Sequence, residues 1–251
     1  MWFAPPETSS SGQFESSLTV EAYTTIRDRI VRGELALGQA VSRRTLAAEM
    51  GIGSLPVSAA LSLLQFEGLL ESRPRAGTRV RIPSADDVMG HYLVREALEV
   101  QAALVFAERA TAVDRSALRR IARRVDALAM QSNRTPYLTL HQKLHRQIAE
   151  GTHCRALCEV IERTHVLASI WLGAMRQGST VDSHRHQDFV EVVVTGDPMS
   201  VAQAVRDHLA VSRERALELL EPYFRLRKKR FVRSERTTPR ATTRRLTQIP
   251  K

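Results

Sequence analysis

The sequence predicts a mainly helical protein in two parts, a small N-terminal unit of three helices and a hairpin followed by an all-helical bundle. Three observations lead to this prediction. Apolar residues recur at helical spacing along most of the 251 residues, strand-like runs with turn residues are confined to residues 69–82, and Pro83 separates the two parts. The hydrophobic content of 43% is enough to form a core, which excludes a wholly disordered chain.

The N-terminal unit follows from its helix boundaries. A first helix is expected over Leu18–Arg32, and Gly33 ends it. Ser42 caps a short second helix that stops at the glycines of residues 51–53, and a third helix runs from Ser54 to the glycine at 68. Two short strands, residues 69–73 and 79–82, then enclose a turn. Helix, helix, tight turn, helix and hairpin are the order of a winged helix-turn-helix.

The second half reads as a bundle of about six helices over residues 84–224. Ser84 and the acids after it suit a helix start, and repeated apolar faces follow, such as Leu93/Ala97/Val100/Leu104 on the first bundle helix. The β-branched run Val192–Thr195 fits the buried face of a helix better than a lone strand. A last helix is expected over Ser200–Tyr223. The division is then a disordered N-terminus (1–17), the winged unit (18–82), the bundle (84–224) and a basic tail (225–251).

The net charge of +10 lies in the tail. Residues 225–251 contain 11 Lys and Arg and one acid, whereas residues 1–224 are balanced. The tail lacks a hydrophobic period and is expected to be disordered. One interpretation is that the tail binds DNA or another polyanion non-specifically. The other is that it is a solvated extension without a role.

Several classes of protein are excluded by what the sequence lacks. No apolar run reaches the ~18 residues of a membrane helix, and residues 1–17 contain no Lys or Arg and no long apolar stretch, unlike a secretory signal. Two cysteines cannot form a disulfide framework, which favours a reducing compartment. The sequence therefore indicates a soluble, cytoplasmic protein without a membrane partner.

With its elements in this order, the chain resembles the GntR family of bacterial transcription regulators, in the subfamily with an FCD (fatty-acid-regulator C-terminal) domain. The similarity covers about residues 18–222. Its motifs in the first half are Arg32-Gly33-Glu34-Leu35, Ser42-Arg43-Arg44-Thr45-Leu46-Ala47, Pro56-Val57 and Glu67-Gly68-Leu69-Leu70. In the second half they are Arg95-Glu96-Ala97-Leu98-Glu99, Leu144-His145-Arg146-Gln147-Ile148-Ala149, Gly196-Asp197 and His208-Leu209.

The resemblance implies a homodimer that reads a roughly palindromic double-stranded operator. The third helix would enter the major groove, with Ser54 and Ser58 at positions where the family usually carries arginine. Because a bidentate Arg–guanine contact is worth ~1–3 kcal/mol, the two serines should weaken base readout. The remaining candidate DNA contacts lie at the second helix and around the wing: Arg43, Arg44, Arg73, Arg75, Gly77 and Arg79.

Histidines form the second candidate site. His141 and His145 are four residues apart, which places both imidazoles on one helix face and suits two ligands of one metal ion. The resemblance adds His186 and His208, because many subfamily members hold a metal with one Asp and three His. His141 stands at the aspartate position. Four neutral imidazoles would suit Zn²⁺ or Ni²⁺, and the alternative is a degenerate site with an exposed His141.

Three nearby features are ambiguous. His184 could replace His186, since the helix register is uncertain by a residue or two. Cys154 and Cys158 near His153 suggest a second metal site, although buried free cysteine is the commoner explanation. Arg95 either helps to hold the carboxylate of an effector or forms an intrahelical ion pair with Glu99.

The sequence thus predicts a DNA-binding transcription regulator whose helical domain binds a divalent metal and a small organic acid that modulates operator binding. The alternatives are a non-specific, architectural DNA-binding protein and a metal-dependent enzyme in a helical bundle. The enzyme is disfavoured because no general base accompanies the histidine pair and no phosphate loop or nucleophile elbow is present. A measurement of DNA sequence selectivity would distinguish the architectural protein from the regulator, and a measurement of catalytic turnover would identify the enzyme.

Overall fold

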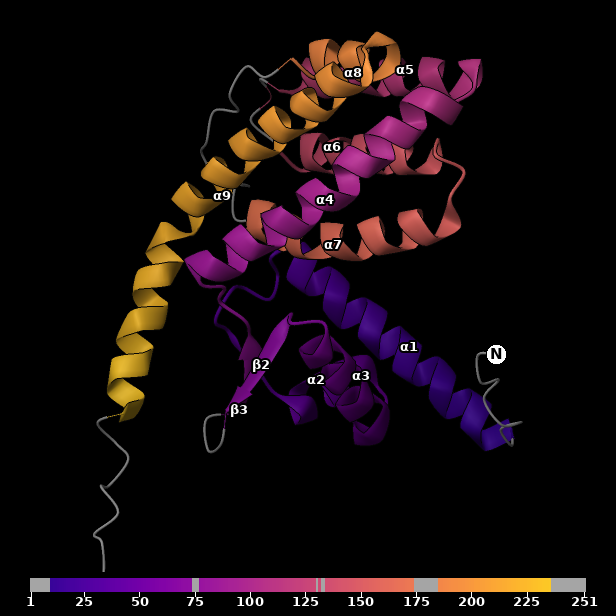
Figure 1. Cartoon of the computed structure of the whole chain (residues 1–251). Helices are drawn as coiled ribbons and strands as arrows, with labels where there is room; N and C mark the ends of the chain where they lie inside the picture. Colours follow the sequence, from indigo (N-terminus) through magenta and orange to yellow (C-terminus); the bar gives the residue numbers. More distant parts are fainter. Residues whose placement is uncertain (1–9, 74–76, 130, 132–133, 174–184, 236–251) are drawn as a thin grey trace, which may run out of the picture.

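The computed structural model describes residues 10–73, 77–129, 131, 134–173 and 185–235. A three-helix winged unit and a helical bundle follow one another along the chain, so the mainly helical fold class is confirmed (Figure 1). No helix within the described ranges is long and apolar enough to cross a membrane.

The winged unit contains α1 (Ser10–Val31), α2 (Arg43–Met50) and α3 (Ser54–Phe66). The Ser42 hydroxyl accepts a hydrogen bond from the Thr45 amide at the start of α2. Gly51 ends α2 in the left-handed conformation, with φ +66°, which permits the sharp turn into α3. A core that includes Ile26, Val57 and Leu64 joins α1 to α3.

The wing is a three-stranded antiparallel sheet in the order β1-β3-β2. Its strands are β1 (Ala40–Val41), β2 (Leu70–Arg73) and β3 (Gly77–Val80). In the hairpin, Ser72 pairs with Thr78, and their hydroxyls are hydrogen bonded at 2.7 Å. The sequence did not predict β1, because two residues are too few to show a strand period.

The bundle consists of α4 (Ala85–Arg109), α5 (Ala112–Leu128), α6 (Arg134–Glu150), α7 (Arg155–Gly173), α8 (His186–Thr195) and α9 (Pro198–Glu235). Helices α4 and α9 pack along each other and cross the bundle from end to end (Figure 1). The capping box of α4 is complete, since the Ser84 hydroxyl accepts from the Asp87 amide and the Asp87 carboxylate accepts from Ser84.

Two termini differ from the expectation. Helix α1 begins at Ser10, so residues 10–17 are helical although the segment 1–17 was expected to be disordered. Helix α9 continues to Glu235 and covers the first part of the tail expected over residues 225–251. The last helix was expected to end at Tyr223, but it continues through Pro222, since one proline removes a single helical hydrogen bond and the Leu, Arg and Lys residues after it favour helix.

The buried face of α4 also differs from the prediction. Leu93 is 70% exposed, and the side that faces the bundle carries Tyr92, Arg95 and Glu99 instead. The two charged residues on this side are buried because Arg95 pairs with Glu99, and Glu99 contacts His145 and His165.

Candidate functional site

The DNA-binding candidates lie on the exposed parts of the winged unit. Arg43 and Arg44 begin α2 and are exposed, Ser54 is the exposed first residue of α3, and Ser58 is half-buried. Gly77 opens β3 with φ +71°, a conformation that favours glycine.

Two of the wing arginines are described, and the third is not. Arg73 ends β2 and lies 3.4 Å from the Glu71 carboxylate, and Arg79 is half-buried in β3. Arg75 lies outside the described residues. The wing thus places Arg73 and Arg79 on the hairpin next to Gly77, as the sequence predicts.

Helix α3 has no charged residue between Ser54 and Phe66. Leu55 in its first turn is 68% exposed and was not among the DNA contacts expected from the sequence. An exposed leucine at a helix start can contact the methyl group of thymine in the major groove. Apolar contact and serine hydroxyls are therefore the means of base readout that α3 offers.

The histidine cluster brings together three helices. His141 and His145 lie on α6, His186 is the first residue of α8, and His208 lies on α9. All four side chains are buried, with exposures of 2–7%. The Nε2 atoms of His141 and His145 are 3.4 Å apart, and those of His145 and His208 are 3.3 Å apart.

His186 completes this cluster from the side. Nitrogens of His141, His145 and His208 lie within 4.8 Å of one another, a set that does not include His186. Its ring centroid is 5.0 Å from that of His141 and 5.4 Å from that of His208. The imidazoles thus surround one point, with three nitrogens already close together and the fourth ring beside them.

Two carboxylates, one on the buried Glu99 and one on the half-buried Asp126, orient two of the imidazoles. Glu99 on α4 lies 2.7 Å from Nδ1 of His145, and Asp126 on α5 lies 2.8 Å from Nδ1 of His186. The Asp126 carboxylate also accepts from the backbone amides of His186 and Gln187. When Nδ1 donates to a carboxylate, Nε2 carries the free lone pair, and Nε2 of His145 faces the Nε2 atoms of His141 and His208.

Burial keeps His141 and His145 neutral. It lowers the pKa of His145 to about 4, although Glu99 opposes this shift, and it lowers the pKa of His141 well below its usual value. Burial would raise the pKa of Glu99, but Arg95 and His145 outweigh it and hold this pKa well below the usual value. At neutral pH the site therefore combines neutral imidazoles at His141 and His145 with an ionised Glu99.

Arg95 forms the intrahelical ion pair. Its Nε donates to Glu99 at 2.6 Å, both side chains are buried, and its guanidinium lies over the Tyr92 ring at 5.1 Å. His165 on α7 lies 3.2 Å from the same carboxylate. Arg95 thus contributes to the charge balance of the cluster through Glu99.

The surroundings of the cluster are tight. The Tyr137 ring stacks on His141 at 5.7 Å, and the Phe189 ring stacks on His208 at 4.5 Å. The cavity next to His145 and His208 has a volume of about 10 Å³, room for about one water molecule. An organic effector would need this part of the bundle to open.

The donor set fits a divalent metal. Neutral, buried imidazoles with oriented Nε2 atoms are the ligands that Zn²⁺ and Ni²⁺ accept, and the carboxylates behind two of them are the usual outer partners of metal-bound histidine. The buried histidine and glutamate groups could therefore hold a metal ion. Glu99, Asp126 and His165 were not predicted as partners, because 46 to 66 residues separate them from the groups they contact.

The ambiguous neighbours are resolved in part. Cys154 and Cys158 are free and half-buried, and Cys158 Sγ donates to the Ala149 carbonyl at 3.1 Å. His153 is exposed and lies 3.2 Å from Asp114. Among the described residues, none of these three belongs to a group that could hold a metal ion. His184 lies outside the described residues.

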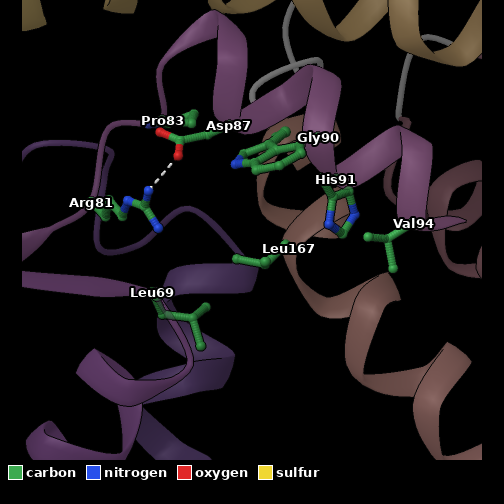
Figure 2. A pocket seen from close by; sticks show the side chains of 10 residues that line it. Leu69, Arg81, Pro83, Asp87, Gly90, His91, Val94 and Leu167 are labelled. Atoms are coloured by element: carbon green, nitrogen blue, oxygen red, sulfur yellow. Dashed lines mark hydrogen bonds and ion pairs between the residues drawn. The ribbon is translucent and has the colours of Figure 1, made fainter.

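A second hollow of about 260 Å³ lies between the winged unit and the bundle. Figure 2 shows Leu69 and Arg81 on one side and His91 and Val94 of α4 on the other, with Arg81 bonded to Asp87. The His91 ring packs edge-on against Trp171 at 4.8 Å. This junction is one place where the bundle meets the winged unit, and α1 and α7 form another.

Two family models match the chain. Residues 18–80 match the bacterial regulatory proteins of the gntR family, and residues 91–211 match the FCD domain. The chain is 25% identical over 149 residues to the "Uncharacterized HTH-type transcriptional regulator YdhC" of Bacillus subtilis (strain 168), a match that spans 59% of this chain and 66% of the relative. It is 29% identical over 195 residues to the "Probable D-xylose utilization operon transcriptional repressor" of Paenarthrobacter nicotinovorans, spanning 74% of this chain and 84% of the relative.

Solved structures share the fold. A GntR crystal structure from Rhodococcus sp. RHA1 superposes with a TM-score of 0.65 and 18% identity, over 80% of this chain and 98% of the other. E. coli McbR/YncC superposes with a TM-score of 0.63 and 17% identity, over 82% of this chain and 98% of the other. The two matched segments leave residues 1–17, 81–90 and 212–251 uncovered. The chain therefore belongs to the GntR family of bacterial regulators, in the branch with an FCD domain, and is a DNA-binding transcription regulator and not an enzyme.

Proposed function

We propose that this regulator binds a divalent transition metal, Zn²⁺ or Ni²⁺, at His141, His145, His186 and His208, and that the metal and a small organic acid modulate operator binding. The observation that carries the proposal is the convergence of four buried imidazoles, two of them oriented by Glu99 and Asp126. Neutral ligands leave the charge of the metal uncompensated, which favours an anion in an open coordination position.

Metal binding is tested by calorimetric titration of the chelator-treated full chain. We expect one Zn²⁺ or Ni²⁺ per chain, negligible binding of Mg²⁺, and ~2.7 kcal/mol of added stability at a metal concentration 100-fold above Kd. The double variant His145→Ala with His186→Ala should retain no metal. Exposed His153 has φ +54°, so His153→Asn is the matched control and should bind normally. Stoichiometric metal in the double variant would contradict the site.

The effector is a small carboxylate, for which Arg95 remains our candidate contact. Because the cavity at the cluster holds about one water molecule, we expect the acid to bind at the metal or in an opened bundle. Fluorescence anisotropy of a DNA complex tests this with acetate, lactate and citrate. D-xylose serves as the comparison, since one relative is named for an operon of D-xylose utilization. If no carboxylate changes DNA affinity in the metal-loaded protein, the effector proposal is wrong.

The protein either regulates transcription by binding a specific DNA sequence or binds DNA non-specifically as an architectural protein. We infer a specific regulator because the winged unit presents Arg43, Arg44 and the wing together with α3. Anisotropy with the upstream DNA of the gene and a scrambled duplex of equal length should show at least tenfold preference, ~1.4 kcal/mol. Equal affinity for these two and for a library of genomic fragments would favour the architectural alternative.

A homodimer is the expected assembly, and α4 offers a face for it. Met89, Leu93 and Val94 on this helix are 44%, 70% and 50% exposed, a concentration of apolar side chains that marks contact surfaces. We infer that a second copy covers this face. Leu93→Lys should shift the molar mass measured by light scattering from dimer to monomer, whereas Val113→Lys, an equally exposed apolar position on α5, should not.

A further inference from the structure

The C-terminal part of α9 leaves the bundle as a strongly basic helix. Between residues 225 and 235 the chain contains six Lys and Arg and one acid. The helical backbone continues through these residues to Glu235. This segment, residues 225–235, is called the basic extension below. The positive charge of the basic extension therefore lies on an α-helix.

A polar junction holds the basic extension against the linker that follows the wing. Arg227 Nη1 donates to the Ile82 carbonyl at 2.7 Å and lies 3.2 Å from the Asp87 carboxylate. Asp87 also accepts from Arg81 at 2.6 Å, an interaction drawn in Figure 2. Burial would raise the pKa of Asp87, but the hydrogen bonds from Ser84 and the charges of both arginines lower it. One carboxylate thus links α9, α4 and the segment after β3.

The position of this junction directs the basic extension toward the winged unit. Eight residues of helix follow Arg227, a length of about 12 Å at 1.5 Å per residue. In Figure 1 the yellow end of α9 continues past the bundle on the side of β2 and β3 and ends at the level of these strands. The extension therefore points toward the end of the molecule that carries the DNA-binding unit and away from the far end of the bundle.

The winged unit itself supplies little charge for holding DNA. Residues 18–82 contain nine Arg and six acids, and α3 contains no charged residue. Contacts between cations and phosphates provide most of the affinity of non-specific DNA binding and position a protein on the duplex. A chain with so few positive charges on its reading elements needs a further cationic element.

We propose that the basic extension of α9 is a second DNA-contacting element, which binds the phosphate backbone of the duplex beside the segment occupied by the wing. Its contacts are independent of base sequence, and the Arg227 contacts position it. It is a fixed part of the interface, in contrast to a flexible tail that attracts DNA only by its charge. This inference is independent of the metal and the effector.

The test compares two variants of the full chain that each remove four positive charges. The first replaces Lys228, Lys229, Arg230 and Arg233 of the extension by Gln, and the matched control replaces Arg240, Arg244, Arg245 and Lys251 by Gln. Anisotropy is measured with the upstream DNA and a scrambled duplex over a series of salt concentrations. We expect the first variant to lose at least tenfold in affinity for both duplexes near physiological salt, and the control less than threefold.

The salt series measures the number of contacts. Each lost phosphate contact should reduce the slope of log K against log salt by about 0.9, so the first variant should show a slope smaller by about 2 to 4. Equal losses of DNA affinity in the two variants would mean that the effect depends on the number of positive charges and not on where they lie. The proposal would then be wrong. Unchanged affinity in both would overturn it as well.

A second measurement keeps the charges intact and does not depend on how the Gln variant folds. Phe231→p-benzoylphenylalanine places a photoreactive group within the basic extension, and Ser116→p-benzoylphenylalanine places it on exposed α5 as a control. Irradiation of the DNA complexes should crosslink position 231 to the duplex and leave position 116 unlinked. Failure of position 231 to crosslink, with DNA bound, would exclude a contact at this segment.

Discussion

Glu99 determines the charge of the buried site at the residue scale. Its carboxylate accepts from Arg95 and contacts His145 and His165, all inside the bundle. Glu99→Gln would leave the guanidinium of Arg95 buried without its counter-charge, which typically costs ~3–5 kcal/mol. We expect a loss of this size in the free energy of unfolding in urea. The double variant Arg95→Met with Glu99→Gln should be less destabilised than Glu99→Gln alone, and a larger loss in the double variant would contradict this explanation.

His91 should give the metal-free protein a measurable pH dependence. Burial, with a further contribution from Arg95, lowers its pKa to about 4 from an ordinary value of 6.5. The unfolded chain therefore binds more protons between these pH values, so His91 contributes stability above pH 6.5 that is lost as the pH falls toward 4. The largest contribution of His91 to the free energy of unfolding is ~3 kcal/mol.

The measurement compares wild type with His91→Phe, which keeps a ring against Trp171 but cannot titrate. Urea unfolding at pH 7 and at pH 4.5 should show a smaller loss of stability in the variant. The pKa values of His141 and His145 shift in the same direction and are common to both proteins, so the difference isolates His91. Parallel pH profiles would show that the His91 pKa is not lowered.

The element scale concerns α3, whose exposed side is uncharged. Ser54→Arg with Ser58→Arg adds two cations where the helix meets DNA, and we expect about a tenfold gain in affinity at physiological salt, since each contact adds ~0.9 to the salt slope. Ser116→Arg with Gln203→Arg adds the same charge to exposed positions on the bundle and should have little effect. If both pairs raise affinity equally, α3 is not the reading helix.

Helices also show how far the sequence could predict the site. The spacing of His141 and His145 predicts two ligands on one helix face, and the resemblance supplies His186 and His208. The inward face of α4 was assigned to Leu93, although the structure buries Arg95 and Glu99 there. An apolar stripe on one helix does not reveal whether the core or a partner molecule covers it. The carboxylates that orient the imidazoles come from other helices, and no local pattern indicates such distant contacts.

The histidine cluster and the DNA-binding unit are connected through two long helices. His208 and Arg227 lie on α9 and are 19 residues apart, about 28 Å along the helix. Glu99 and Asp87 lie on α4, and the Arg227–Asp87 contact joins both helices beside Arg81. Since α4 and α9 pack along each other, a shift of His208 upon metal binding would move the junction that carries the winged unit.

This connection predicts reciprocal coupling between metal and DNA. If Zn²⁺ or Ni²⁺ changes the affinity for the upstream duplex by a given factor, the duplex must change the affinity for the metal by the same factor. Arg227→Gln removes the contacts to Asp87 and Ile82 without touching the histidines, so we expect metal binding to persist while this factor falls toward one. Calorimetry of metal with and without DNA, set against anisotropy of DNA with and without metal, measures both sides of the cycle. A factor that is unchanged in Arg227→Gln would mean that the coupling reaches the winged unit by a route other than the α9 junction, such as the contact between α1 and α7.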